Sequence, residues 1–450
     1  MITAQKTFET FFENNPNIEF IDCFLHDLNG LQRGKRVPAQ SWQKLLTEGV
    51  ELPASMFVSE INGETILSTG RGFNDADPDM HCIPIPNTIR LLPWSNGTRA
   101  QVMLEMMDVN NDKYFMNPRT RLDSILKQFE ELGLKAVLAI ELEFYIIGAD
   151  SIEQPLLPLS KQTGLPIKAG QVYHIDTLLE FENFLQDMEE GARLFEIPTT
   201  TITSEYSPGQ FEINLKHTDN IDQACIDSML LKKLVKLAAG KNSYQSTFMS
   251  KPYVEHNGSG MHIHVSLYDN QGKNVFQDQE TLHKAIGGLI AASNESMLYF
   301  APHANSYRRY MDDPNSYVPI RASWGKNNRS VALRIPNSLP EATRIEHRIA
   351  GADANPWLCS AALLAGIHYG LTNQIQPPAE GQGYTNNNPA FHLLPKTWES
   401  ALNHHAESKI IQEYFTKDFH RAFHEVKNYE HNQFQEYITP KEYEWYMKNL

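Results

Sequence analysis

The sequence predicts an α+β protein of two domains, the larger built on a mostly antiparallel sheet flanked by helices. Four short stretches alternate polar and apolar side chains, as a strand with one buried face does. Segments with apolar residues at helical spacing separate these strands along the chain. A length of 450 residues exceeds what a single hydrophobic core usually supports. The four alternating stretches are residues 137–147, 204–215, 260–267 and 343–350.

The first hundred residues mix strand-like runs with loops. Residues 18–27 alternate toward a turn at Leu28-Asn29-Gly30, which predicts the first arm of a hairpin. Prolines and aspartates punctuate residues 74–88, so a loop is expected there. A further strand is predicted at residues 100–109. Together these segments indicate a small α/β domain at the N-terminus.

The strongest boundary signal is Asn117-Pro118, because asparagine is a favoured helix N-cap and proline fits the first helical turn. Apolar residues then recur at helical spacing until Gly133, which ends the helix. We therefore expect an N-terminal domain at residues 1–112 and a larger domain at residues 113–450. Further helices are expected at about 176–194, 220–240, 281–300 and 354–372.

Composition excludes several classes of protein. The net charge of −15 repels nucleic acid and anionic membrane surfaces. The longest apolar segment, residues 356–370, is too short to cross a bilayer, and the N-terminus has no signal-peptide pattern. The four cysteines lie far apart without a CxxC pair, which favours reduced thiols. We expect a cytoplasmic protein with neither nucleic acid nor membrane as a partner.

Carboxylates gather on the polar faces of two predicted strands. Glu141 and Glu143 share one face about 6.5–7 Å apart, a spacing that suits two metal ions side by side. The alternative is a solvated outer strand, but the apolar flanks argue against it. Glu205 and Glu212 bracket a Ser-Pro-Gly turn. Oxygen ligands with one imidazole favour Mg²⁺ or Mn²⁺ over zinc.

Residues 257–266, NGSGMHIHVS, are the most specific run in the chain. Its two glycines allow the backbone to approach a ligand closely. His262, His264 and Ser266 then point to one side of a strand. A pair of histidines is often structural and HxH also occurs in zinc hydrolases, but the glycines and the nearby carboxylates favour a ligand site.

Seven arginines fall between residues 308 and 348, where they alternate with residues that belong in a core. Arginine runs are usually solvated, yet arginines on an inner polar face bind carboxylate and phosphate in bidentate fashion. No Walker A or GxGxxG loop is present, so a nucleotide would bind by another route. A metal-dependent, phosphate-handling enzyme is the resulting hypothesis. The seven are Arg308, Arg309, Arg321, Arg329, Arg334, Arg344 and Arg348.

Several of these motifs, in this order, resemble the glutamine synthetase family. They are Glu141 with Glu143, NGSGMHIH, NRS at residues 328–330 and RIEHR at residues 344–348. The resemblance implies a small β-grasp domain before the catalytic domain. It also implies a homo-oligomer, a dodecamer in this family, with active sites between subunits. The implied substrates are glutamate, ATP and a small amine, and the implied cofactors are two or more Mg²⁺ or Mn²⁺ ions per site.

The resemblance also implies roles for individual residues. One metal ion would be held by Glu143, Glu205 and Glu212, and a second by Glu141, His262 and Glu346. Glutamate would be bound by Asn257, Gly258, Arg309 and Arg348. ATP and the transferring phosphate would contact His264, Ser266, Arg329, Arg334 and Arg344, with Arg329 and Arg334 catalytic. Asp27 of a neighbouring subunit would accept the proton of the incoming amine.

The choice of amine rests on a departure from the family pattern. Ammonia-using members carry a glutamate at the place of Tyr317, so its loss favours a longer amine. Asp312 and Asp313 could meet the distal ammonium of a diamine, or could equally be surface charges. Other segments, among them RIEHRIAGADANPW, resemble the branch that uses putrescine.

The predicted function is ATP-dependent ligation of the glutamate γ-carboxylate to putrescine or a related polyamine through γ-glutamyl phosphate, in polyamine catabolism. The alternatives are an ammonia-using glutamine synthetase, a non-catalytic oligomer of the same fold, and a metal-dependent hydrolase.

Overall fold

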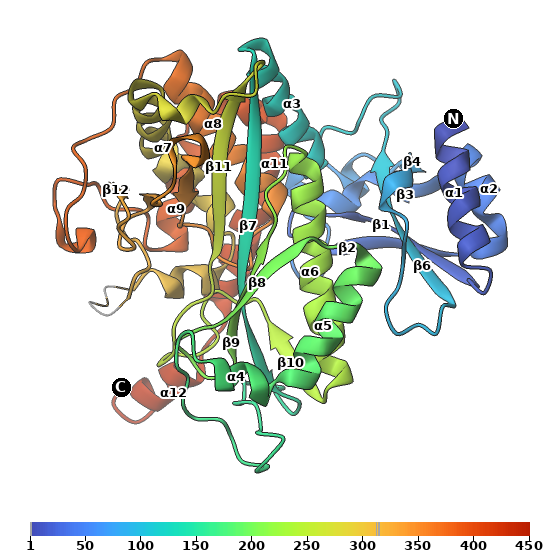
Figure 1. The fold of residues 1–450 in the computed structure, drawn as a ribbon, viewed down its shortest axis with the longest axis horizontal. Coiled ribbons are helices and arrows are strands. Elements are labelled where there is room, and N and C mark those ends of the chain that lie inside the picture. The colour runs from blue at the N-terminus through green and yellow to red at the C-terminus, as the bar shows by residue number, and fades with distance from the viewer. Residues whose placement is uncertain (1, 312, 314–315) are drawn as a thin grey trace.

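The computed structural model describes residues 2–311, 313 and 316–450, which form a smaller N-terminal part and a larger part, each built on one sheet (Figure 1). The smaller sheet has the strand order β2-β1-β6-β4-β3, with β5 paired to β6. The larger sheet has the order β12-β13-β14-β11-β7-β9-β8, with β10 paired to β7. The mixed α and β architecture expected from the sequence is therefore present.

The N-terminal sheet is mixed, because β1 pairs with β2 in antiparallel and with β6 in parallel fashion. The predicted hairpin is confirmed, with its turn at residues 27–31, and so is the strand predicted at residues 100–109. The elements are α1 (Ile2–Asn14), β1 (Phe20–His26), β2 (Gln32–Pro38), α2 (Trp42–Glu48), β3 (Val50–Pro53), β4 (Asp79–Pro84), β5 (Arg90–Leu91) and β6 (Arg99–Met106).

One expectation in this part is wrong. Residues 74–88 are not a continuous loop, because β4 lies within them and pairs with both β3 and β6. Met80, Cys82 and Pro84 alternate into the core, and the prolines at the segment's end mask this period of two. Pro84 is tolerated because it closes the strand.

The larger part carries the predicted antiparallel sheet. Each pair of named strands in it is antiparallel except β12 with β13. Its strands are β7 (Leu134–Gly148), β8 (Thr199–Ser204), β9 (Gln210–Leu215), β10 (Tyr244–Thr247), β11 (Met261–Asp269), β12 (Trp324–Lys326), β13 (Leu333–Ile335) and β14 (Ile345–His347). Its helices are α3 (Pro118–Glu131), α4 (Ile175–Glu180), α5 (Glu182–Phe195), α6 (Ile221–Lys241), α7 (Gln279–Phe300), α8 (Pro356–Thr372), α9 (Trp398–Ala406), α10 (Ile410–Phe415), α11 (Lys417–Glu436) and α12 (Pro440–Tyr446).

Local sequence explains where the helices begin. The side chain of Asn117 accepts a hydrogen bond from the Arg119 N–H at 3.1 Å, and Pro118 occupies the first turn of α3. Asn355 caps α8 in the same way through the Trp357 N–H, at 3.0 Å. The helix predicted at residues 176–194 is interrupted at Phe181. The backbone of Phe181 is not helical, and its buried ring packs on Phe211.

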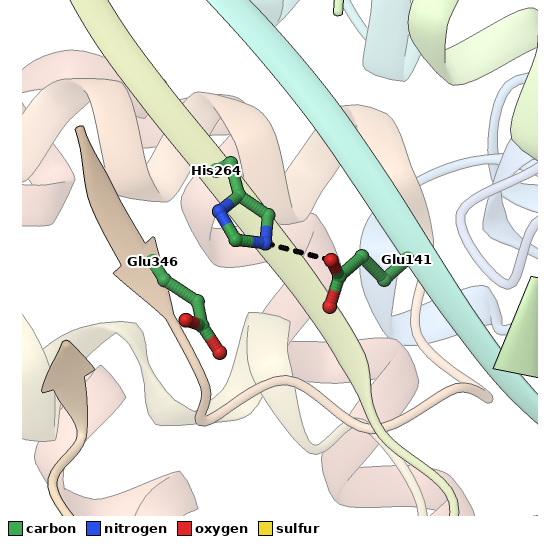
Figure 2. A group of neighbouring side chains, drawn as sticks. All are labelled: Glu141, His264 and Glu346. Atoms are coloured by element: carbon green, nitrogen blue, oxygen red, sulfur yellow. Dashed lines mark ion pairs between the residues drawn. The ribbon is translucent and has the colours of Figure 1, made fainter. Parts of the chain in front are cut away.

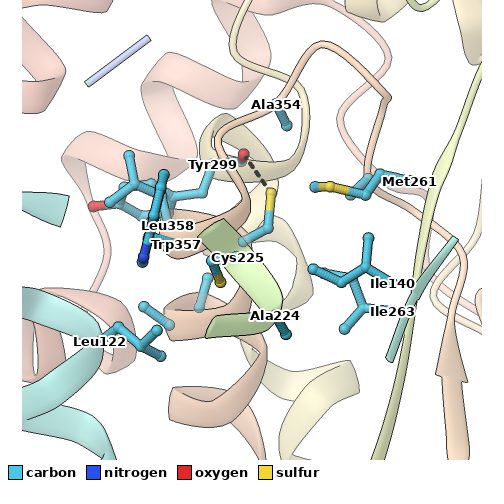
Figure 3. Packing of buried hydrophobic residues seen from close by; sticks show 14 of the residues in the cluster. Leu122, Ile140, Ala224, Cys225, Met261, Ile263, Tyr299, Ala354, Trp357 and Leu358 are labelled. Carbon is cyan, nitrogen blue, oxygen red and sulfur yellow. Dashed lines mark hydrogen bonds between the residues drawn. The ribbon is translucent and has the colours of Figure 1, made fainter. Parts of the chain in front are cut away.

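Strand β7 is the centre of the larger sheet, with β11 on one side and β9 on the other (Figure 1). Its carboxylates therefore do not lie on a solvated edge strand. On the opposite face Ile140 and the β11 residues Met261 and Ile263 are fully buried. Figure 3 shows this apolar face against residues of α6 and α8, among them Cys225 and Trp357. Because side chains alternate along a strand, burying this face places Glu141, His262 and His264 together on the other face.

No described helix combines the length and the hydropathy that crossing a bilayer would require.

Candidate active site

A cavity of about 640 Å³ opens on the polar face of the larger sheet. Strand register decides which side chains meet there. His262 lies opposite Glu141, Glu143 opposite Glu212, and His264 opposite Glu346. Cross-strand neighbours stand close enough for their side chains to interact. Five strands thus carry carboxylate, imidazole and guanidinium groups to one surface, and these groups line the cavity.

The carboxylates and imidazoles form a compact cluster. The His264 Nε2 lies 3.0 Å from a carboxylate oxygen of Glu141, and the His262 Nδ1 lies 3.4 Å from the other. Figure 2 shows Glu141, His264 and Glu346 pointing toward one another from β7, β11 and β14. The ligand atoms of these three lie within 4.8 Å of one another, as do those of Glu141, Glu212 and His262. Either group could hold a metal ion.

Burial and mutual repulsion change the pKa values of the carboxylates in this cluster. Burial, together with the charges of Glu141 and Glu143, raises the pKa of Glu212 to about 9. Burial and the charge of Glu143 likewise raise the pKa of Glu205 to about 7. Burial opposes ionisation of Glu141 as well, but hydrogen bonds from His262 and His264 hold its pKa below the usual range. Negative charge is crowded here, so the donor set fits a divalent cation.

Arginines occupy the other half of the cavity. Arg334 donates to Glu346 at 2.7 Å, and Arg348 donates to the second oxygen of the same carboxylate. Although burial opposes it, Arg348 and its neighbours lower the pKa of Glu346 to about 2. Arg344 donates to the His264 ring at 3.2 Å. Arg329 is exposed at the rim, so its guanidinium can reach an anion in the cavity.

Two of the seven predicted arginines are not among the described residues that line the cavity. Arg321 instead donates to the backbone carbonyls of Asn386 and Phe391, at 2.8 and 2.7 Å, and Arg308 points to solvent. Arg309 does line the cavity, but its guanidinium also donates to the Ile349 carbonyl at 2.6 Å. Five of the seven arginines therefore line the cavity, and their role in binding anions stays a prediction.

Three hydrogen bonds hold the loop at residues 257–258, one of them from the Asn257 N–H to the Ser207 hydroxyl at 3.0 Å. The Tyr145 hydroxyl donates to the Asn257 carbonyl at 2.6 Å, and the Gln210 amide donates to the Gly258 carbonyl at 3.0 Å. A Cβ on Gly258 would lie 2.6 Å from the Ser250 carbonyl oxygen. Glycine is therefore required at this position by the chain's own packing, and the predicted close approach of the backbone to a ligand stays a prediction.

Comparison with known proteins agrees with this geometry. A profile described as the catalytic domain of glutamine synthetase matches residues 115–446. γ-Glutamylputrescine synthetase PuuA of Escherichia coli (strain K12) is 41% identical over 98% of this chain and 94% of its own length.

The chain belongs to the glutamine synthetase family.

Two other relatives and a solved structure are similar over nearly the whole chain. Glutamate–isopropylamine ligase of a Pseudomonas species is 29% identical, with 95% of each chain covered. Glutamine synthetase of Staphylococcus aureus (strain MW2) is 27% identical, with 97% of each chain covered. The solved structure titled GmaS/ADP complex has a TM-score of 0.84 at 23% identity over 98% of this chain and 99% of its own, which supports the fold.

Two of the residues that the family resemblance implied lie outside the cavity lining. Ser266 is buried and its hydroxyl donates to the Thr343 carbonyl at 3.0 Å. Asp27 lies in the β1–β2 turn with its side chain fully buried, and its carboxylate accepts from Arg33 at 2.9 Å and from the N–H groups of Asn29 and Leu31. Both oxygens of Asp27 accept hydrogen bonds within this chain, and burial raises the pKa of its carboxyl. Its role as proton acceptor for the amine in a neighbouring subunit's site stays a prediction.

Other predicted residues do reach the cavity. Those along its lining are Glu141, Glu143, Glu205, Glu212, Asn257, Gly258, His262, His264, Arg309, Tyr317, Arg329, Arg334, Arg344, Glu346 and Arg348. Asp313 lines it as well, whereas Asp312 lies outside the described residues.

Sequence reasoning missed several lining residues that come from loops. Tyr173, Lys251, Met311 and Tyr384 line the cavity without having been predicted for it, and so does Tyr206, which lies within the stretch at residues 204–215. Tyr206 follows Glu205 directly, so its neighbourhood was the one available signal. The others are brought in by tertiary folding, which no local period reveals.

In EDTA, which removes divalent cations, the free energy of unfolding is expected to fall as the pH rises from 4.5 to 9. Glu205 and Glu212 have raised pKa values, so in this window the folded state keeps protons that the unfolded state has released, and stability falls as pH increases. Added Mg²⁺ should remove this trend, and more strongly at higher pH. Melting temperatures in EDTA and in excess Mg²⁺ across this range test it; a melting temperature that rises with pH in EDTA contradicts it.

Proposed function

We propose that this protein is an ATP-dependent ligase that joins the γ-carboxylate of glutamate to an amino group of putrescine or a related polyamine, in polyamine catabolism. The observation that carries the proposal is the 41% identity to γ-glutamylputrescine synthetase over 98% of the chain. The cavity supports it, because an anionic cluster that fits cations faces an arginine rim that fits phosphate and carboxylate.

The reaction has two steps. A γ-carboxylate oxygen of glutamate attacks the terminal phosphorus of ATP, which gives γ-glutamyl phosphate and ADP. The amine nitrogen then attacks the acyl carbon, phosphate leaves, and the amine loses a proton. We propose that the loop at Asn257 and Gly258 positions glutamate, with Arg309 and Arg348 binding its carboxylates. Arg329, Arg334 and Arg344 would offset the negative charge of the transferring phosphate, with His264 close by.

Bound divalent cations would neutralise charge between ATP and the glutamate carboxylate. We propose two or more Mg²⁺ or Mn²⁺ ions, held within the set Glu141, Glu143, Glu205, Glu212, His262 and Glu346. The raised pKa of Glu212, caused by burial and by neighbouring carboxylates, supports this assignment because a cation would relieve that repulsion.

We further propose that the loop containing Tyr317 selects the amine. Tyr317 lines the cavity and is 50% exposed, and no acidic side chain stands at its position. Tyr317→Glu is expected to shift the ratio of kcat/KM for ammonium over putrescine upward by about tenfold, since a carboxylate there would attract a small cation. Tyr317→Phe is the matched control and should leave the ratio unchanged; an unchanged ratio in both variants contradicts the assignment.

The proposed function is tested by incubating the protein with ATP, Mg²⁺, glutamate and equal concentrations of putrescine and ammonium. Product masses then report which amine is joined. Predominant γ-glutamylputrescine is expected. Glutamine as the only product would contradict the proposal and indicate a glutamine synthetase that uses ammonia. Absence of product with either amine would favour the non-catalytic alternative.

The proposal also covers the oligomeric state of the protein and its location in the cell. We propose a cytoplasmic homo-oligomer, dodecameric as the family resemblance implies, with a β-grasp N-terminal domain at residues 1–112 and a catalytic domain at residues 113–450. The exposed side chains of Tyr443, Trp445 and Met447 on and after α12 support self-association, since they leave apolar area in water. Light scattering should give a mass of many subunits; a monomer at working concentration would contradict this.

A further inference from the structure

A short segment, residues 383–386, is hydrogen-bonded to two loops that line the cavity of the candidate active site. Tyr384 of this segment lines the cavity itself. One of the two loops carries Tyr317 and the other carries Arg329, and both of these side chains line the same cavity. Because hydrogen bonds in a network reinforce one another, a segment bonded to both loops can fix their relative position.

Tyr384 holds the chain on the N-terminal side of Tyr317. Its hydroxyl lies 2.8 Å from the Asp313 carbonyl oxygen and 3.1 Å from the Ser316 carbonyl oxygen, and it donates its proton between them. The Asn386 side-chain amide donates to the same hydroxyl at 3.2 Å, so this hydroxyl accepts one bond while it donates. Ser316 directly precedes Tyr317. The hydroxyl therefore restrains the backbone next to Tyr317.

Asn386 holds the chain on the C-terminal side of Tyr317. It is buried, its side-chain amide donates to the Val318 carbonyl at 2.9 Å, and its side-chain oxygen accepts the Ile320 N–H at 3.0 Å. The backbone carbonyl of Asn386 accepts a hydrogen bond from Arg321 at 2.8 Å. Val318 directly follows Tyr317. The residues on both sides of Tyr317 are thus bonded to one segment.

The segment is itself anchored to the loop that carries Arg329. Thr385 is fully buried, its hydroxyl donates to the Ser330 carbonyl at 2.8 Å, and its N–H donates to the Ser330 hydroxyl at 3.1 Å. The Asn328 amide donates to the Gly383 carbonyl at 2.8 Å. A segment anchored in this way cannot move freely, so its bonds to the Tyr317 loop limit where that loop can lie.

We propose that Tyr384 and Asn386 are positioning residues for the choice of amine, which hold the backbone on each side of Tyr317 so that its side chain meets the amine. This role rests on the proposed function and deepens it, because it concerns the amine of that reaction. A misplacement of about 1 Å can cost about a hundredfold in rate, so a loop that contacts substrate must be held. Neither residue needs to contact the amine for this role.

Tyr384→Phe tests the role, because it removes the hydroxyl and keeps the ring. KM for putrescine should rise by at least about fivefold, while KM for ATP and for glutamate should stay within about twofold. The bonds that anchor the segment to the Arg329 loop are untouched, whereas a general loss of structure would change all three constants together. Tyr244→Phe is the matched control: the Tyr244 hydroxyl donates to the Leu159 carbonyl at 2.9 Å, outside the cavity lining, and its loss should change none of these constants.

Coupling to Tyr317 separates positioning from direct contact with the amine. In the Tyr384→Phe protein, the shift in amine preference expected from Tyr317→Glu should shrink from about tenfold to about threefold or less, since the new carboxylate is no longer held in place. An unchanged KM for putrescine in Tyr384→Phe, or an equal shift in both backgrounds, would overturn this role while the ligase function stands. An unsubstituted protein that joins no putrescine would overturn the proposed function and this role with it.

Discussion

Glu141→Gln is expected to lower kcat/KM by about a thousand-fold, or ~4 kcal/mol of transition-state stabilisation. Glu141 belongs to both groups of side chains whose ligand atoms lie within 4.8 Å of one another. It also accepts a hydrogen bond from Asn214 at 2.6 Å and contacts His264 at 3.0 Å. The glutamine keeps the size of the side chain but removes the charge that holds a cation and both imidazoles in place.

Steady-state rates of ATP-dependent amide formation measure this effect. Glu130→Gln makes the same chemical change at an exposed position on α3 and should leave the rate unchanged. The melting temperature of Glu141→Gln in EDTA should fall, because His262 and His264 hold the pKa of Glu141 below its usual range and its charge therefore stabilises the folded state at neutral pH. Rates are accordingly compared well below that melting temperature. Activity within about threefold of the unsubstituted protein would contradict the assignment of Glu141 to cation binding.

Gly258→Ala is expected to lower kcat/KM for glutamate by about a hundredfold. The added Cβ would lie 2.6 Å from the Ser250 carbonyl oxygen and 2.8 Å from the Cγ of Arg309. Neither neighbour can move freely, since Arg309 is fixed by the Ile349 carbonyl at 2.6 Å. The loop must therefore shift, which misplaces both the glutamate-binding backbone and the arginine.

A glycine with open space around it provides the control. Gly240 lies in the last turn of α6, and a Cβ there would meet nothing within 4 Å. Gly240→Ala should keep full activity and raise stability slightly, because alanine is the better helix former. A Gly258→Ala protein with unchanged KM for glutamate would show that this loop does not bind glutamate.

Sequence periodicity predicted the centre of the site well, for a physical reason. Glu141, Glu143, His262 and His264 lie on two paired strands, and in a strand the side-chain period alone decides which face a residue occupies. The apolar partners of these residues pack on the opposite face, as Ile140 and Ile263 do. The pattern that makes the core therefore also makes the site.

Periodicity does not predict how far along a strand the cavity extends. Ser266 shares the face of His262 and His264, but the next segment covers it and takes its hydrogen bond through the Thr343 carbonyl. Arg321 shows a similar limit, because a residue type suited to binding anions is used to fix backbone carbonyls. Tyr173 and Tyr384 reach the cavity from loops, so only the tertiary fold reveals them.

Oxygen transfer tests the central claim most directly. Glutamate with both γ-carboxylate oxygens labelled with ¹⁸O is incubated with ATP, Mg²⁺, putrescine and the protein, and the released phosphate is analysed by mass. Attack of the γ-carboxylate on ATP predicts one ¹⁸O in each phosphate for each γ-glutamylputrescine formed, with the other ¹⁸O kept in the amide. Unlabelled phosphate, or amide formed without ATP, would contradict the proposed ligase.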